Sequence, residues 1–275
     1  MGLIWSPQDS ARHAAEYLGV LSDEPSKLVP MGCRTFDSLT GGLGPGTLST
    51  LSAATGVGKT RSMLAFADRQ SLRGVDVGVL SLEDPPDLFG LKFISAETGI
   101  DGMRIRRKDV TAAEKQVIAG AISRLEARRL KLAYPVGGRL ESVLEAATEL
   151  LDGGCRVLWV DYLQKLRGAA GSRVDEIGAN MARLQELAYK YSVPVILVSQ
   201  LRRRYEFDKE GNYIIPTIQD LKGNGDLENE SRVIIMLYPD PGGGKDIIGM
   251  VAKSAYGGTG YAFRMTDKSG VLVEQ

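Results

Sequence analysis

The chain has 275 residues, and its 34 lysines and arginines balance 34 aspartates and glutamates, so its formal net charge at pH 7 is zero. A composition of 43% hydrophobic and 25% charged residues excludes disordered and fibrous proteins. Two cysteines exclude a disulfide framework, and no apolar run approaches the ~18 residues of a membrane span. We therefore expect a cytoplasmic protein with no membrane partner, in which any charge that binds nucleic acid is concentrated locally.

Residues 1–30 are predicted to form an N-terminal arm or linker, separate from one domain over residues 31–275. Within the arm, Ser6 and Pro7 are typical of a helix start, and the helix is expected to end near Leu18. A helix of this length is marginal in water by itself. Two interpretations remain open, a flexible tail or an arm that packs on a neighbouring subunit.

From residue 31 onward, strand and helix patterns alternate. A capping box at Thr111 and Glu114 opens a helix that carries Val117, Ile118, Ile122 and Leu125 on one side. The alternation predicts an α/β fold with a mainly parallel, doubly wound sheet. Beyond residue 230, glycine-rich turns separate short strands, which predicts an antiparallel extension of the sheet edge. The expected strands are 48–53, 75–82, 157–160, 195–198, 233–237, 247–253, 261–265 and 271–273, and the other expected helices are 59–72, 140–151 and 174–191.

One segment fits the phosphate-binding loop G-x-x-x-x-G-K-[ST], except that alanine stands at the first position. An expected strand leads into it and an expected helix leads out. Small residues let backbone amides surround a β-phosphate, Lys59 can reach the β- and γ-phosphates, and the Thr60 hydroxyl can hold Mg²⁺. The sequence therefore predicts a nucleotide site made of Ala53, Ala54, Thr55, Gly56, Val57, Gly58, Lys59 and Thr60.

Three further strands are expected to end in polar side chains, namely Glu83, Asp161 and Gln200. In a parallel sheet these ends reach the same edge as the phosphate-binding loop. Asp161 has the form of a Walker B acid that orients Mg²⁺, Glu83 can polarise an attacking water, and Gln200 can contact the γ-phosphate. The three side chains together favour a nucleotide hydrolase.

The chain resembles the RecA-like motor domain of DnaB-type replicative helicases over roughly residues 31–268. The Asp-Tyr-Leu-Gln element that starts at Asp161 and the Ser-Gln-Leu element around Gln200 are not usual in RadA-like or KaiC-like relatives. The resemblance implies a RecA-like P-loop NTPase core over residues 31–275, with ATP and Mg²⁺ as cofactors. The other segments that carry the resemblance are 41–46, 81–83 and 220–225.

The resemblance also implies a role for individual residues. Glu83 matches the catalytic base and Gln200 the γ-phosphate sensor. Thr60 and Asp161 match the groups that hold Mg²⁺, and Lys253 matches a lysine that reaches the nucleotide of the neighbouring subunit. Two channel loops would contact single-stranded DNA, through Arg167, Arg173, Lys222, Gly223 and Gly225.

The chain departs from the family pattern in two places. Ala255 stands where the family carries an arginine finger, so Lys253 serves alone, another arginine such as Arg264 substitutes, or hydrolysis is slow. In addition, no segment before residue 31 matches the family's N-terminal domain, so a collar that binds primase is not expected in this chain.

The sequence therefore predicts an ATP-driven, ring-forming and hexameric DNA helicase that moves along single-stranded DNA during DNA replication. A phage or plasmid replicon is the expected setting, with a loader or another replisome protein as a further partner. The rivals are a RecA/RadA-like repair ATPase and a KaiC-like regulatory ATPase, neither of which unwinds duplex DNA. A small-molecule kinase is disfavoured because no acceptor-binding domain or lid is apparent.

Overall fold

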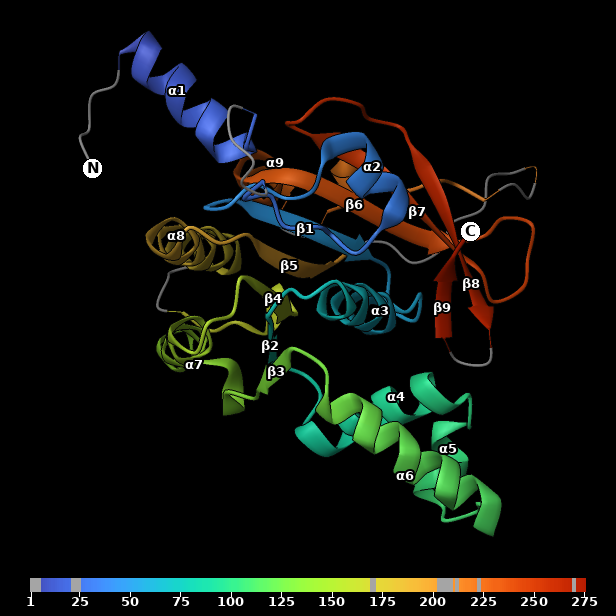
Figure 1. The fold of residues 1–275 in the computed structure, drawn as a ribbon. Coiled ribbons are helices and arrows are strands. Elements are labelled where there is room, and N and C mark those ends of the chain that lie inside the picture. The colour runs from blue at the N-terminus through green and yellow to red at the C-terminus, as the bar shows by residue number, and fades with distance from the viewer. Residues whose placement is uncertain are drawn as a thin grey trace.

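A computed structural model describes residues 6–20, 26–168, 172–201, 210, 213–221, 224–268 and 271–275. Within these residues, nine strands form one sheet in the order β3-β2-β4-β5-β1-β6-β7-β8-β9 (Figure 1). None of the described helices is both long and apolar enough to cross a lipid bilayer. The strands are β1 (Leu48–Ala53), β2 (Val77–Ser81), β3 (Leu130–Ala133), β4 (Val157–Asp161), β5 (Val195–Gln200), β6 (Ser231–Pro239), β7 (Ile247–Ser254), β8 (Ala262–Lys268) and β9 (Val271–Glu274).

Helices cover both faces of the parallel part of the sheet. Figure 1 shows α3 on one side of the central strands and α7 and α8 on the other. The helices are α1 (Pro7–Leu18), α2 (Arg34–Thr40), α3 (Lys59–Leu72), α4 (Pro86–Thr98), α5 (Gly102–Arg106), α6 (Ala112–Glu126), α7 (Leu140–Asp152), α8 (Arg173–Tyr191) and α9 (Asn224–Glu230), with single 3-10 turns η1 (Val136–Gly138), η2 (Leu163–Lys165) and η3 (Ile218–Asp220).

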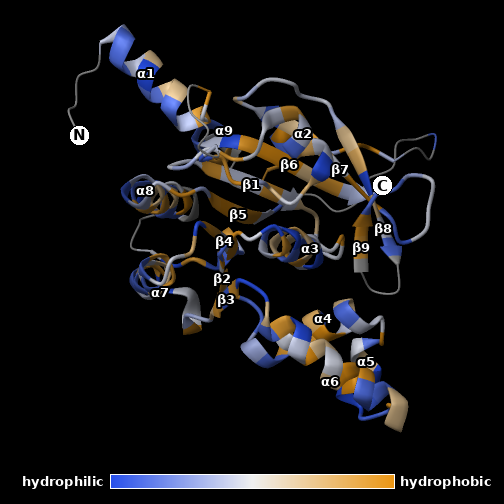
Figure 2. Ribbon diagram, viewed as in Figure 1, coloured by the Kyte–Doolittle hydropathy of each residue, from blue (hydrophilic) through white to orange (hydrophobic). Residues whose placement is uncertain are grey.

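Strand β4 shows why the sheet needs a layer on each face. Val157 and Trp159 pack in the core on the α3 side, whereas Leu158 and Val160 pack in the core on the side of α7 and α8. Successive side chains of a strand point to opposite faces, so a strand that is apolar throughout must be covered twice. Figure 2 accordingly shows the central strands in the hydrophobic colours and polar residues on the outer faces of the helices.

The antiparallel extension joins the parallel part of the sheet through β6. Strands β1 to β5 pair in parallel, and β6 pairs in parallel with β1. On its other side β6 pairs antiparallel with β7, as β7 does with β8 and β8 with β9. The predicted antiparallel extension over the last four strands is therefore confirmed. The parallel pairing of β6 with β1 was not predicted, and it is allowed by the long connection from β5 through η3 and α9.

Helix α6 also departs from the expected packing. Its capping box at Thr111 and Glu114 is present, so its start is confirmed. However, Val117 and Ile122 of the predicted apolar side are 48% and 44% exposed. The helix packs mainly on α4, which the sequence analysis did not predict, and this unit lies beyond the β3 edge of the sheet (Figure 1).

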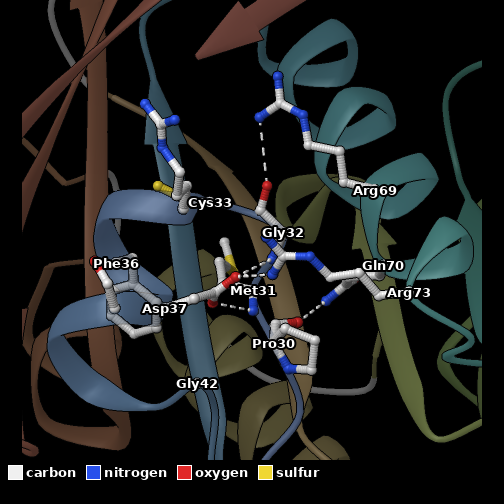
Figure 3. A network of polar contacts seen from close by, with 12 residues as sticks. Pro30, Met31, Gly32, Cys33, Phe36, Asp37, Gly42, Arg69, Gln70 and Arg73 are labelled. Atoms are coloured by element: carbon white, nitrogen blue, oxygen red, sulfur yellow. Dashed lines mark hydrogen bonds and ion pairs between the residues drawn. The ribbon is translucent and has the colours of Figure 1, made fainter. Parts of the chain in front are cut away.

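The last turns of α3 hold the segment that joins the arm to the domain (Figure 3). Gln70 donates a hydrogen bond to the Pro30 carbonyl at 2.6 Å and accepts one from Trp159 Nε1 at 2.8 Å. Arg73 pairs with Asp37, whose carboxylate accepts backbone hydrogen bonds from residues 31 and 32. Helix α1, by contrast, has no buried residue.

The carboxyl-terminal strand is fastened to the same region. Arg69 of α3 donates to the Leu272 carbonyl at 2.7 Å and lies 3.7 Å from Glu274. The Glu274 carboxylate in turn accepts the backbone N–H groups of Arg34 and Thr35, at 2.6 Å and 2.7 Å. These N–H groups open helix α2, whose own N-cap residue supplies no side-chain hydrogen bond. The end of β9 therefore caps α2.

Gln70→Leu is expected to destabilise the protein by about 1 to 3 kcal/mol, because the buried Trp159 Nε1–H would lose its acceptor. Urea unfolding measures this difference. Arg73→Ala is the control, since its ion pair with Asp37 is 44% exposed on the arginine side and contributes less than about 1 kcal/mol. An equal decrease in the free energy of unfolding for the two variants would contradict a larger contribution from the buried Gln70 amide.

Candidate active site

The phosphate-binding loop lies between β1 and α3, as the sequence predicts. Gly56 and Gly58 have φ angles of 86° and 106°, in the left-handed region that favours glycine. Gly58 is the N-cap of α3 and a Cβ there would lie 3.2 Å from the side chain of Ile247. The loop thus presents backbone amides and the amino end of a 14-residue helix to one site, an arrangement that attracts phosphate.

Lys59 lies between the loop and two carboxylates. Its ammonium donates to the Ala54 carbonyl at 3.4 Å. Burial lowers the pKa of Lys59, while the charges of Asp161 and Glu83 act in the opposite direction and raise it. The lysine is therefore close enough to both acids to interact with them, although they come from different strands.

Asp161 is the most buried charged group of the site, at 1% exposure. Burial raises its pKa from 3.8 to about 6, and the nearby carboxylates of Glu83 and Asp84 add to the rise, whereas Thr60 and Lys92 oppose it. Thr60 lies beside the carboxylate, but neither Asp161 oxygen has a hydrogen bond of good geometry to the described residues. A buried carboxylate without donors, next to a hydroxyl and a phosphate-binding loop, fits a hydrated Mg²⁺ ion.

Glu83 reaches the same edge from β2. Ser81, the last residue of β2, pairs with Asp161 in register, and the Leu82 N–H donates to the Asp161 carbonyl at 2.7 Å. Glu83 itself is exposed and lines the cavity next to the loop. Asp84 turns away and pairs with Lys92 of α4.

Gln200 contacts the loop directly. Its side-chain amide donates to the Thr55 hydroxyl at 2.6 Å, and its backbone N–H donates to Gln164 Oε1 at 3.1 Å. Gln164 also donates to Ser199 at 2.8 Å. Ala53, at the first loop position, is fully buried and pairs in register with Gln200. The ends of β1, β4 and β5 are therefore joined through side-chain amides.

A cavity of about 630 Å³ extends from the loop toward α4 and β9. This volume is within the range of small-molecule sites. Its polar end contains Lys59, Thr60 and Glu83. Its apolar side combines side chains of α3, α5, α6 and β9 with two residues of α4, a helix that was not predicted because its sequence lacks helical periodicity. These lining residues are Leu64, Leu91, Phe93, Met103, Leu125 and Leu272. The prolines at 85 and 86 were the available signal for the start of α4.

The other predicted residues that the structure describes lie apart from this cavity. Lys253, on β7, donates to the Glu228 carbonyl of α9. Arg264 forms ion pairs with Asp240 at 2.9 Å and Asp246 at 3.8 Å. Arg167 follows η2 and is exposed, and Gly225 is within α9. The Arg173 side chain, Lys222 and Gly223 lie outside the described residues.

Residues 29–260 match the sequence family described as "DnaB-like helicase C terminal domain". The chain belongs to this family. Replicative DNA helicase DnaC of Bacillus subtilis is 25% identical over 217 residues, which are 77% of this chain and 47% of that protein. Replicative DNA helicase DnaB of Leifsonia xyli is 27% identical over 222 residues, 79% of this chain and 48% of that protein. The chain spans about half the length of these curated relatives.

Solved structures share the fold. One of them, described as an ATPase domain, superposes with a TM-score of 0.84 at 22% identity, and the match covers 99% of both chains. A DnaB-like replicative helicase, whose structure was described with its interactions with primase, superposes with a TM-score of 0.82 at 22% identity. This match covers 98% of this chain and 67% of the helicase chain. A KaiC-like protein from Pyrococcus horikoshii superposes with a TM-score of 0.61 at 16% identity, and the match covers 90% of this chain and 98% of that protein's chain. The predicted RecA-like α/β fold is confirmed.

Asp161→Asn is expected to stabilise the nucleotide-free protein, increasingly as pH rises. The folded state of the wild type disfavours the ionised Asp161, so its stability falls as pH rises from the unfolded pKa through the folded pKa of about 6. The advantage of the variant should grow by about 1 kcal/mol between pH 5 and pH 8 in EDTA, measured by urea unfolding. The exposed Asp109→Asn is the control, and an Asp161→Asn advantage that does not change with pH would contradict the assignment.

Proposed function

We propose that this DnaB-like domain is the motor of an ATP-driven, ring-forming DNA helicase that moves along single-stranded DNA during replication. The observation that carries the ATPase part is the bare, buried Asp161 carboxylate beside Lys59 and Thr60, with Glu83 at the adjoining cavity. Membership of the DnaB-like family supports the helicase part. The printed names of the relatives, replicative DNA helicases, support replication.

In this proposal the loop from Ala53 to Thr60 binds the phosphates of ATP through its amides, with Lys59 on the β- and γ-phosphates. Thr60 and Asp161 would hold Mg²⁺, which when bound neutralises phosphate charge during transfer. Glu83 orients the attacking water and accepts its proton. Gln200, in contact with Thr55 of the loop, would exchange that contact for the γ-phosphate.

The proposed ring places each nucleotide between two subunits, with Lys253 supplied by the neighbour. Ala255 is exposed, and its methyl side chain offers no cation at this position. Arg264 is engaged with Asp240. We propose a homohexamer, with Arg167, Arg173, Lys222, Gly223 and Gly225 facing single-stranded DNA in the channel, and a loader or other replisome protein as a partner.

A forked-duplex assay tests the proposed function. The wild type is expected to displace the labelled strand with ATP and Mg²⁺. Glu83→Gln should bind ATP and single-stranded DNA with nearly unchanged affinity but displace no strand, because it lacks the proton acceptor. Wild-type hydrolysis with DNA binding but without displacement would favour a RecA/RadA-like activity. Hydrolysis that single-stranded DNA does not change would favour a KaiC-like one.

Complementation tests whether Lys253 acts in trans. Lys253→Ala and Lys59→Ala are each expected to hydrolyse almost no ATP. Mixed in equal amounts, they should recover up to about a quarter of wild-type turnover, because one interface in four would combine an intact loop with an intact Lys253. Recovery is measured as steady-state phosphate release after subunit exchange. A mixture that stays inactive, with mixed rings demonstrated by differential labels, would show that Lys253 acts within its own subunit.

A further inference from the structure

The connection between β3 and α7 is joined to the segment that follows η2. Arg139 and Arg167 form a parallel β-bridge. The Arg167 N–H donates to the Gly138 carbonyl at 2.8 Å, and the Leu140 N–H donates to the Arg167 carbonyl at 2.9 Å. These two hydrogen bonds fix the backbone of Arg139 beside that of Arg167, although the residues come from separate connections of the sheet.

Gly138 makes this approach possible. Its φ is 64°, and a Cβ at this position would lie 2.5 Å from the carbonyl oxygen of Lys165. Backbone cannot give way as the end of a flexible side chain can, so a side chain at 138 would separate the two segments. The local sequence is therefore suited to bringing Arg139 close to the segment that holds Lys165 and Arg167.

The result is a concentration of positive charge, which we call the Arg139 cluster and define as Arg139, Lys165 and Arg167. All three are exposed. Neither segment 134–140 nor segment 162–168 contains an acidic residue. Among the described residues none of the three forms an ion pair. The Lys165 ammonium lies 5.9 Å from the centre of the Tyr162 ring.

The nearest acids lie just outside these two segments. Glu141 is in the first turn of α7, and Glu176 accepts the backbone N–H of Gly168 at 2.7 Å.

The position of Arg139 at the start of α7 does not favour the stability of that helix. It is the N-cap residue of the 13-residue α7 and supplies no side-chain hydrogen bond to the helix. A cation there meets the positive end of the helix dipole, whereas serine, threonine, aspartate or asparagine would stabilise it. A residue that breaks the local preferences without a compensating contact points to function.

We propose that Arg139 is a further contact residue for the phosphate backbone of single-stranded DNA, acting together with Lys165 and Arg167. This inference rests on the proposed function, since Arg167 belongs to the loop proposed to face DNA. It adds the β3–α7 connection to the DNA-contacting surface. A guanidinium can bind a phosphate through two N–H groups without reading a base, so the contact is tolerant of sequence.

The test is binding of a fluorescent oligothymidylate by the full chain with a non-hydrolysable ATP analogue, measured by anisotropy at several salt concentrations. Arg139→Ala should weaken binding about threefold to tenfold, and the slope of log affinity against log salt should fall by about 0.7. Arg139→Lys should lose less affinity than Arg139→Ala and keep the wild-type salt slope, because it retains the charge but not the contact through two N–H groups. Nucleotide affinity and melting temperature should remain those of the wild type.

Arg107→Ala is the matched control, because Arg107 is exposed, lies at the end of α5 and has no ion pair within the described residues. It should bind DNA like the wild type. Arg139→Ala binding with wild-type affinity and slope would overturn this inference while leaving the proposed function intact. Loss of nucleotide affinity or melting temperature in Arg139→Ala, without recovery in Arg139→Lys, would overturn it in favour of a structural role. A wild type that binds no oligonucleotide would instead overturn the proposed function itself.

Discussion

The site depends on an ionisable group that the fold buries with no well-aligned hydrogen-bond donor among the described residues. Asp161 ends the strand that lies between β2 and β5, with a packed core on each face of the sheet. Ionising such a carboxyl is costly, as its raised pKa shows. The cost is tolerable because Lys59 lies nearby and because two large cores stabilise the surrounding strands. Both Asp161 carboxylate oxygens are therefore available to a ligand.

Helix α3 connects this charged site to distant parts of the chain. It begins at the phosphate-binding loop and ends where Arg69, Gln70 and Arg73 hold the segment after the arm and the last strand. Gln70 also contacts Trp159, which is on the same strand as Asp161. Met63 and Phe66 of the same helix share an apolar core with Met31, so polar contacts and apolar packing together join the phosphate-binding loop to the segment after the arm.

Features with a local cause were predictable from the sequence, and features set by distant partners were not. The bounds of β1 and α3 follow from the loop between them, and the box at Thr111 and Glu114 marks the start of α6. The direction of β6 relative to β1 depends on the path of the connection before it, and the residues of β6 do not indicate that path. The cavity wall from α4 was missed for lack of periodicity. Nothing near Arg139 in sequence indicates Arg167, because a long-range β-bridge joins them.

The capping of α2 by Glu274 has a consequence for the order of folding. The two partners are about 240 residues apart in sequence, so the loop that their contact closes is among the longest in the domain, and closing it is entropically expensive until the sheet between them exists. Helix α2 should acquire its amino-terminal hydrogen bonds only after β9 has joined the sheet. In hydrogen-exchange experiments on refolding protein, the amides of Arg34 and Thr35 should thus gain protection among the last, together with those of β9.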